Sequence, residues 1–242
     1  MTPYAWTLPS GWVVRVRDPA EWSIFCEIYV DREYDDAIRL SLATPRADGH
    51  FYFLDLGANH GLFTLRLLDR IQSAFPTAHC HGQLVEAAQA NCRLLKENLA
   101  QIPSAFATLE VHHAAVGSRE PFVELWHDGA SHTTHSLLAA PGAKGRECER
   151  VPTLDLAVAT QAWPRLDFVK IDIEGAEEAL FENFAAVLEK TSVLCFELHT
   201  QQCNKEKISA LLKSHGFVLH HTLGKAYAAE QILTWVKKSP AP

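Results

Sequence analysis

The stretch Phe51-Tyr-Phe-Leu-Asp55-Leu-Gly57-Ala-Asn59-His-Gly61 decides the fold that we predict for this chain. Its apolar first half predicts a short buried strand, its two glycines predict a tight turn, and the residues from Leu62 to Leu68 predict the start of a helix. In this arrangement the backbone can approach a ligand at the carboxyl end of a sheet. Glycine suits the turn because it adopts positive φ and leaves room for a ligand.

The rest of the chain alternates predicted strands and helices, which is typical of an α/β fold with a doubly wound, mostly parallel sheet. We expect seven sheet strands, over residues 51–56, 80–86, 107–116, 166–172, 192–197, 217–221 and 231–236. The last two close the sheet, and an antiparallel arrangement is one option for them. An extra strand over 121–126 and a polar loop from His127 to about Arg150 are expected after the third strand. One helix with an apolar face from Leu180 to Leu188 is expected after the fourth.

Residues 1–48 differ from residues 49–242, which form the predicted sheet domain. This N-terminal extension is rich in aromatic residues, including Trp6, Trp12 and Trp22, and its pattern predicts a strand and one or two short helices. It is either a lid over the binding site or a packing extension. Packing is the simpler interpretation, because aromatic side chains most often serve cores.

The composition limits the classes of function. The chain has 242 residues, of which 48% are hydrophobic, and this is enough for one α/β domain with an accessory segment. Its net charge of −7 offers no basic surface for nucleic acid. The six cysteines form no CxxC pair, which predicts reduced thiols in a cytoplasmic protein. We see no signal peptide, and no apolar run approaches the roughly 20 residues of a membrane span.

Four acidic residues end predicted strands: Asp55, Glu86, Asp172 and Glu197. In a doubly wound sheet these ends face one crevice, where such folds bind their ligands. Glu86 could accept hydrogen bonds from both ribose hydroxyls of a nucleoside. The separation between Gly57 and Glu86 in the sequence is longer than the roughly 20 residues typical of NAD-binding folds. Asn59 also occupies a position at which a dinucleotide-binding motif favours a second glycine.

At these residues the sequence resembles the FkbM family of S-adenosylmethionine (SAM) methyltransferases, a class I, Rossmann-like family. The matching segments are 54–64, 85–86, 114–120, 153–155, 169–177 and 196–199. The run Lys170-Ile-Asp172-Ile-Glu174-Gly-Ala-Glu177 is the most specific of them. Ala87 follows Glu86 where the family commonly has proline, and the His-rich loop at 132–135 is also unusual.

The resemblance implies methyl transfer from SAM, mostly to hydroxyl oxygens of sugars, polyketides and other natural products. It implies that Gly57, Asn59 and Gly61 shape the pocket for the methionine end of SAM, next to Asp55. Glu86 would hold the ribose. Ala115 and Val116 would lie along the adenine, and Asp172 would sit near the methionine amine and the reacting methyl group.

An alcohol acceptor must lose its proton during attack, which typically gains about 10²–10⁴-fold from a general base. The candidate general bases are His199, Glu197, Asp172 and Glu174. Lys170 is a further catalytic candidate, either as an ion-pair partner or as an active group. An imidazole such as that of His199 titrates near neutral pH when unperturbed. The residues assigned to substrate binding are Glu174, His132 and His135.

No spacing in the sequence requires a metal. Asp172, Glu197 and His199 remain an alternative ligand set of two oxygens and one nitrogen.

Three other functions remain open at this point. An NAD(P)-linked oxidoreductase would share a similar sheet, a non-enzymatic binding module could keep the cofactor fold, and an N-methyltransferase would differ only in its acceptor. The expected partner is a small-molecule acceptor, with no nucleic acid and no membrane, and the sequence leaves a homodimer open.

Overall fold

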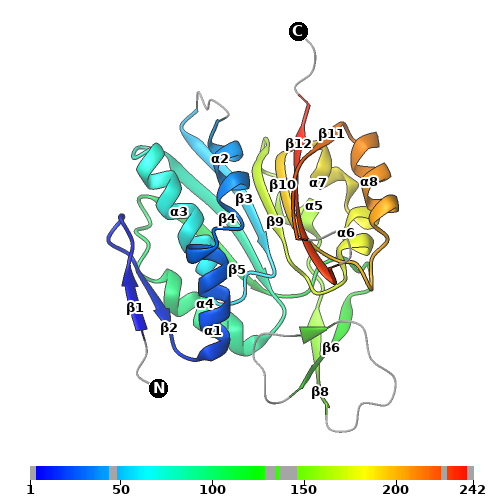
Figure 1. Ribbon diagram of the computed structural model, residues 1–242, viewed down its shortest axis with the longest axis horizontal. Helices are drawn as coiled ribbons and strands as arrows, with labels where there is room; N and C mark the ends of the chain where they lie inside the picture. The colour runs from blue at the N-terminus through cyan, green and yellow to red at the C-terminus, as the bar shows by residue number, and fades with distance from the viewer. Residues whose placement is uncertain (1–3, 44–47, 129–134, 137–145, 225–227, 239–242) are drawn as a thin grey trace.

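A computed structural model gives the structure of the protein and describes residues 4–43, 48–128, 135–136, 146–224 and 228–238. A central sheet with helices on both faces makes up most of the molecule (Figure 1). Across these described ranges, no helix combines the length and the apolar character needed to cross a membrane.

The central sheet has seven strands, as predicted. Their order is β11 (Phe217–Leu223), β12 (Glu230–Lys237), β10 (Thr191–His199), β9 (Leu166–Ile171), β3 (His50–Leu56), β4 (His79–Glu86) and β5 (Ala107–His113). Strand β12 is antiparallel to both of its neighbours, and the strands from β10 to β5 are parallel. The strand order reverses between β3 and β9, so a ligand crevice is expected beyond the carboxyl ends of these two strands.

Each face of the sheet carries its own layer of helices because successive strand residues point to opposite sides. On β3, Phe51 and Phe53 belong to one hydrophobic cluster, and Leu54 and Leu56 belong to the other. The first layer contains α1 (Pro19–Phe25), α2 (Asp35–Ala43), α3 (Leu62–Ala74) and α4 (Gln89–Leu99). The second contains α5 (Leu156–Ala159), α6 (Glu177–Asn183), α7 (Ala185–Glu189) and α8 (Lys205–Ser214).

The N-terminal segment is part of the first layer. It begins with a hairpin of β1 (Tyr4–Thr7) and β2 (Val13–Val16), and a π-helical turn, η1 (Cys26–Val30), follows α1. The ring of Tyr34 lies 5.1 Å from that of Phe63 on α3, edge to face. These contacts support the packing interpretation of residues 1–48, and the lid role stays a prediction.

The segment between β5 and β9 differs from our expectation. Part of the predicted loop is β8 (Arg146–Pro152), which pairs with β6 (Phe122–Asp128); with β7 (His135–Ser136) they form a separate three-stranded sheet. Strand β8 was missed because polar or charged residues fill most of it, which hides the alternation of a half-buried strand. Strand β5 ends at His113 rather than Val116, and Ala115 instead bridges to Thr153.

Two further elements differ from the predictions. Strand β1 was not expected, and all four of its residues are exposed, so it carries no apolar alternation. The single helix expected after the fourth strand is broken into α6 and α7 at Phe184, whose φ of −125° and ψ of 43° are not helical.

The packing of α2 can be tested by comparing Ile38→Ala with Val30→Ala. Ile38 is 1% exposed and Val30 is 60% exposed. We expect Ile38→Ala to lower the free energy of unfolding by about 2–5 kcal/mol, the usual effect of a buried large-to-small change. Val30→Ala should stay within about 0.5 kcal/mol of the wild type. Urea unfolding measures both, and equal effects would show that α2 does not belong to the core.

Candidate active site

The turn after β3 is held in one conformation by the two strands beside it. Gly57 has a φ of 75°, and a Cβ atom there would lie 1.7 Å from the backbone oxygen of Asp172. Its amide and that of Ala58 both donate to the backbone oxygen of Val85, at 2.9 Å. Only glycine fits at this position, because β9 approaches the turn so closely.

Gly61 is a point of close packing between helices, and the role in the pocket that the resemblance implies for it stays a prediction. It precedes α3 with a φ of 79°, and a Cβ atom there would lie 2.6 Å from Cδ1 of Leu95 on α4. Gly61 therefore allows α3 and α4 to pack closely and does not line the ligand cavity.

The buried side chain of Lys170 connects the carboxyl ends of β3 and β9 through its polar contacts. Its ammonium Nζ donates to the backbone oxygen of Gly57 at 2.7 Å and lies 3.4 Å from Oδ2 of Asp172 and 3.5 Å from Oδ1 of Asp55. The predicted pairing of Lys170 with a carboxylate is thus present. Burial lowers the pKa of Lys170, but Asp172 and Asp55 outweigh this effect and raise it above its ordinary value, so the side chain is charged.

Asp55 lies under the site and does not reach its wall. It is fully buried, and its Oδ2 accepts a hydrogen bond of 2.6 Å from Oγ1 of Thr64. Its position explains why an acid precedes the glycine turn: the carboxylate compensates the charge of Lys170. A direct contact of Asp55 with a cofactor, as the resemblance implies, stays a prediction.

The other residues predicted to bind the cofactor line one cavity at the carboxyl ends of the strands. They are Gly57, Asn59, Glu86, Ala115, Val116 and Asp172. The Glu86 carboxylate is fixed in this wall, because Oε2 accepts from the amide of Asn59 at 2.8 Å and Oε1 from that of Ala88 at 2.9 Å. Burial raises the pKa of Glu86.

Sequence reasoning missed several residues of this cavity, among them Asn91 and Leu125. Asn91 donates to Oε1 of Glu86 at 3.4 Å, and its own Oδ1 lies 3.1 Å from Nε2 of His60. A polar residue one turn before Leu95, on the buried side of α4, was the available signal. Leu125 reaches the cavity from β6, and no pattern in the sequence indicated that this extra strand approaches the site.

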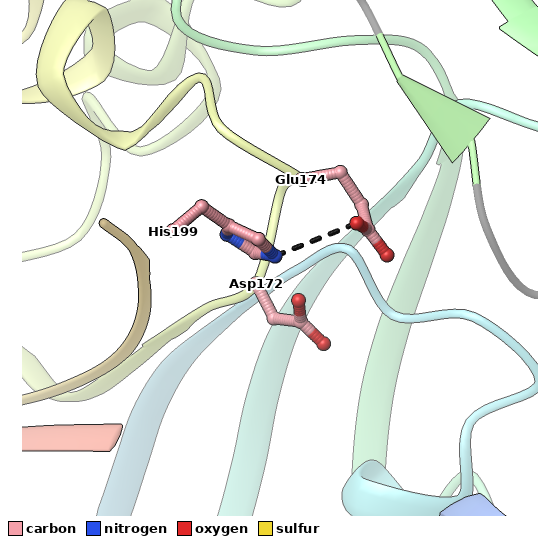
Figure 2. Close-up of side chains that lie close together, drawn as sticks. All are labelled: Asp172, Glu174 and His199. Carbon is pink, nitrogen blue, oxygen red and sulfur yellow. Dashed lines mark ion pairs between the residues drawn. The ribbon is translucent and has the colours of Figure 1, made fainter. Parts of the chain in front are cut away.

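On the other side of Asp172, His199 lies between two carboxylates at the end of β10. Its Nδ1 is 3.1 Å from Oε1 of Glu177, and its Nε2 is 3.4 Å from Oε2 of Glu174. Figure 2 shows the second contact, with Asp172 beside it. Burial lowers the pKa of His199, but Glu174 and Glu177 raise it to about 11. An imidazole that stays protonated is a poor proton acceptor at neutral pH.

Glu177 is a site residue that the sequence analysis missed. It is fully buried, its Oε1 accepts from the amide of Gly175 at 3.1 Å, and Sγ of Cys203 donates to its Oε2 at 3.1 Å. Its place in the Lys170–Glu177 run was a signal, but an acid in the first turn of a helix is also explained by the helix dipole.

Glu197 faces a hollow in which half of the lining residues are acidic. The hollow is lined by Glu27, Glu33, Glu197, Leu223, Gly224, Glu230, Gln231 and Ile232. Burial and the nearby Asp172 carboxylate raise the pKa of Glu197 to about 8. This proton affinity suits a general base near neutral pH.

Two predicted histidines and the alternative metal set need separate mention. His132 lies outside the described residues, and for His135 only its place in β7 is described. The alternative metal set of Asp172, Glu197 and His199 is not brought together. In the described part of the chain, potential ligands gather instead as Asp172, Glu174 and His199, and as Glu197, His199 and Glu230.

Comparison with known proteins agrees with this arrangement. The family described as Methyltransferase FkbM domain matches residues 55–222. No curated protein matches the chain. Magnesium protoporphyrin IX methyltransferase (ChlM) from Synechocystis, solved with bound SAM, is 11% identical, with a TM-score of 0.50 over 92% of this chain and 86% of that one. TrmN from Thermus thermophilus is 12% identical, with a TM-score of 0.47 over 93% and 55%. The likeness to ChlM shows the fold.

The charge of Lys170 can be tested by Lys170→Met, which keeps the length of the side chain. We expect a loss of about 3–5 kcal/mol in the free energy of unfolding, because the Asp55 carboxylate loses its buried partner. Lys207→Met is the matched control, since Lys207 pairs with Glu178 at the surface and its side chain is 51% exposed. Urea unfolding compares the two. Equal stabilities would show that Asp55 does not need the ammonium.

Proposed function

The chain belongs to the FkbM methyltransferase family, and we propose that it transfers a methyl group from SAM to a hydroxyl oxygen of a small molecule. The acceptor class that we propose is a sugar or another natural product. One observation carries the proposal: Asp172 borders the cavity that contains Glu86, and its carboxylate acts on the pKa of Glu197 from the other side. A site for the cofactor thus adjoins a carboxyl group that can take a proton.

The cavity suits SAM in its donor set. The Glu86 carboxylate faces it as an acceptor for ribose hydroxyls, and Ala115, Val116 and Leu125 offer an apolar surface for the adenine. Asn59 Oδ1 is buried and has no hydrogen-bond partner among the described residues, so it can accept a hydrogen bond from a ligand. When bound, SAM supplies a methyl group that its sulfonium already activates.

The residues of this chain then have three tasks in the proposed reaction. They align the acceptor oxygen with the S–CH₃ bond, exclude water, and take the hydroxyl proton. With SAM bound, the O–C bond would form as the S–C bond breaks, S-adenosylhomocysteine would be the leaving product, and the Glu197 carboxylate would take the hydroxyl proton. Alignment alone can supply several kcal/mol, and up to about 7–11 kcal/mol in the most favourable intramolecular cases.

Nitrogen methylation is a second candidate. The four carboxylates of the hollow, Glu27, Glu33, Glu197 and Glu230, are complementary to a cationic amine. Incubation with SAM and matched alcohols and amines, followed by mass spectrometry and NMR of the products, distinguishes the two. A methyl group found on oxygen supports the proposal, and methylation of amines alone would contradict it.

Glu86→Gln tests the cofactor site. The variant keeps the shape of the side chain but removes the charge, so hydrogen bonds to the ribose should weaken. We expect the binding of S-adenosylhomocysteine, measured by calorimetry, to lose about 1.5–3 kcal/mol, the scale of hydrogen bonds to charged groups. Glu110→Gln is the control, because Glu110 has a 61% exposed side chain on the neighbouring strand β5. Unchanged affinity in a folded Glu86→Gln protein would remove Glu86 from the site.

Glu197→Gln tests the proton acceptor. We expect turnover of the methylated acceptor to fall by at least about 10²-fold, the lower range for a lost general base. The affinity for S-adenosylhomocysteine should be unchanged, since Glu197 does not line the cofactor cavity. Glu189→Gln, at the end of α7 and with a 66% exposed side chain that lines neither the cavity nor the hollow, controls for the change of charge. Wild-type turnover in Glu197→Gln would leave alignment alone as the source of catalysis.

A further inference from the structure

We propose that Asp172, Glu174 and His199 form a binding site for one divalent cation of the Mn²⁺ class. One potential ligand atom from each residue lies within 4.8 Å of the other two. Figure 2 shows the three side chains turned toward a common point. Asp172 follows β9, Glu174 lies in the turn before α6, and His199 ends β10, so separate parts of the fold converge on this position.

A residue outside this set orients the imidazole as a metal ligand requires. His199 is only 6% exposed, and the fully buried Glu177 holds its Nδ1 at 3.1 Å. Nε2 is thereby directed toward Glu174 and Asp172. Metal-binding histidines almost always have their second ring nitrogen fixed by such an outer carboxylate, carbonyl or water. Both ring nitrogens of His199 face carboxylates, so a cation that binds Nε2 takes the place of the proton there, and this proton is released on binding.

The donor set indicates the kind of cation. Two carboxylates and one imidazole provide three protein ligands, which leaves positions open for water or a substrate oxygen. Imidazole favours transition metals, whereas carboxylates suit Mg²⁺, Ca²⁺ and Mn²⁺, so Mn²⁺ satisfies most of the set. Asp172 can take part although Lys170 lies 3.4 Å from its Oδ2, because a carboxylate has several acceptor positions on its two oxygens.

The second group of potential ligands, Glu197, His199 and Glu230, is a weaker candidate. Glu230 is exposed on the edge of the hollow, and using Nε2 of His199 there would leave Glu174 without its partner. In the preferred site, the same Nε2 faces the two carboxylates on the side of the cofactor cavity, which Asp172 and Glu174 both line.

The position of the cation gives it a role, and this part of the inference rests on the proposed function. A cation between the cofactor cavity and Glu197 can bind the hydroxyl oxygen of the acceptor and favour loss of its proton. The binding itself does not depend on the identity of the acceptor, because it is measured with the metal alone.

The experiment titrates the full chain with Mn²⁺ and follows the free ion by electron paramagnetic resonance. Mn²⁺ is the appropriate probe because it stands low in the Irving–Williams order, so surface imidazoles and thiols compete weakly for it. We expect one Mn²⁺ per chain and a rise in melting temperature, as for any ligand of the native state. Glu174→Gln should weaken the affinity at least about tenfold and reduce the rise in melting temperature.

Two variants make the result specific. Glu182→Gln removes the same charge from an exposed position on α6 and should bind Mn²⁺ as the wild type does. Glu230→Gln should also leave the affinity unchanged. Absence of binding, equal binding by Glu174→Gln, or a loss that follows Glu182 or Glu230 would overturn the proposal. Binding of S-adenosylhomocysteine to the same samples tests the proposed function separately, so either claim can fail alone.

Discussion

The interaction on which the site depends is the buried ammonium of Lys170 under the ends of β3 and β9. It binds the backbone oxygen of Gly57 at 2.7 Å and faces Asp55 and Asp172, so one cation fixes the glycine turn to the neighbouring strand. A buried charge is tolerated only with such partners. The carbonyl contact also requires that Gly57 lie against β9, where any side chain would collide with Asp172. The motif residues of the two strands are therefore one physical unit.

The crevice next to Lys170 carries an excess of negatively charged side chains. Asp172, Glu174, Glu177 and Glu197 converge there, while Lys170 is committed to the floor. The crevice therefore stabilises positive charge, and the raised pKa values of His199 and Glu197 are two expressions of this field. A proton on the imidazole, a divalent cation and the sulfonium of SAM are three species that the same field can favour. In the proposed reaction the sulfonium charge disappears as the hydroxyl loses its proton.

The sequence predicts the sheet and the wall of the cofactor cavity well, because both follow from local sequence patterns. Alternating strands and helices identified all seven strands, and the glycine turn located the cavity with Glu86 on its wall. Contacts between distant segments could not be read in this way. Glu177 looked like a helix-dipole acid, and its role appears only when β10 brings His199 beside it. The contacts of Asp55 with Lys170 and of Gly61 with Leu95 likewise join segments that are distant in the sequence.

The segments that match the family and the segments outside the match line different parts of the site. The family match covers residues 55–222 and includes the whole wall of the cofactor cavity. The hollow beside Glu197 is built mostly from outside that range, by Glu27 and Glu33 on one side and Glu230 on the other. Glu27 is placed there by the π-helical turn η1, a rare geometry that often occurs at functional sites. We therefore propose that the family core sets the choice of methyl donor, and that the N-terminal segment and β12, which line the hollow, set the choice of acceptor.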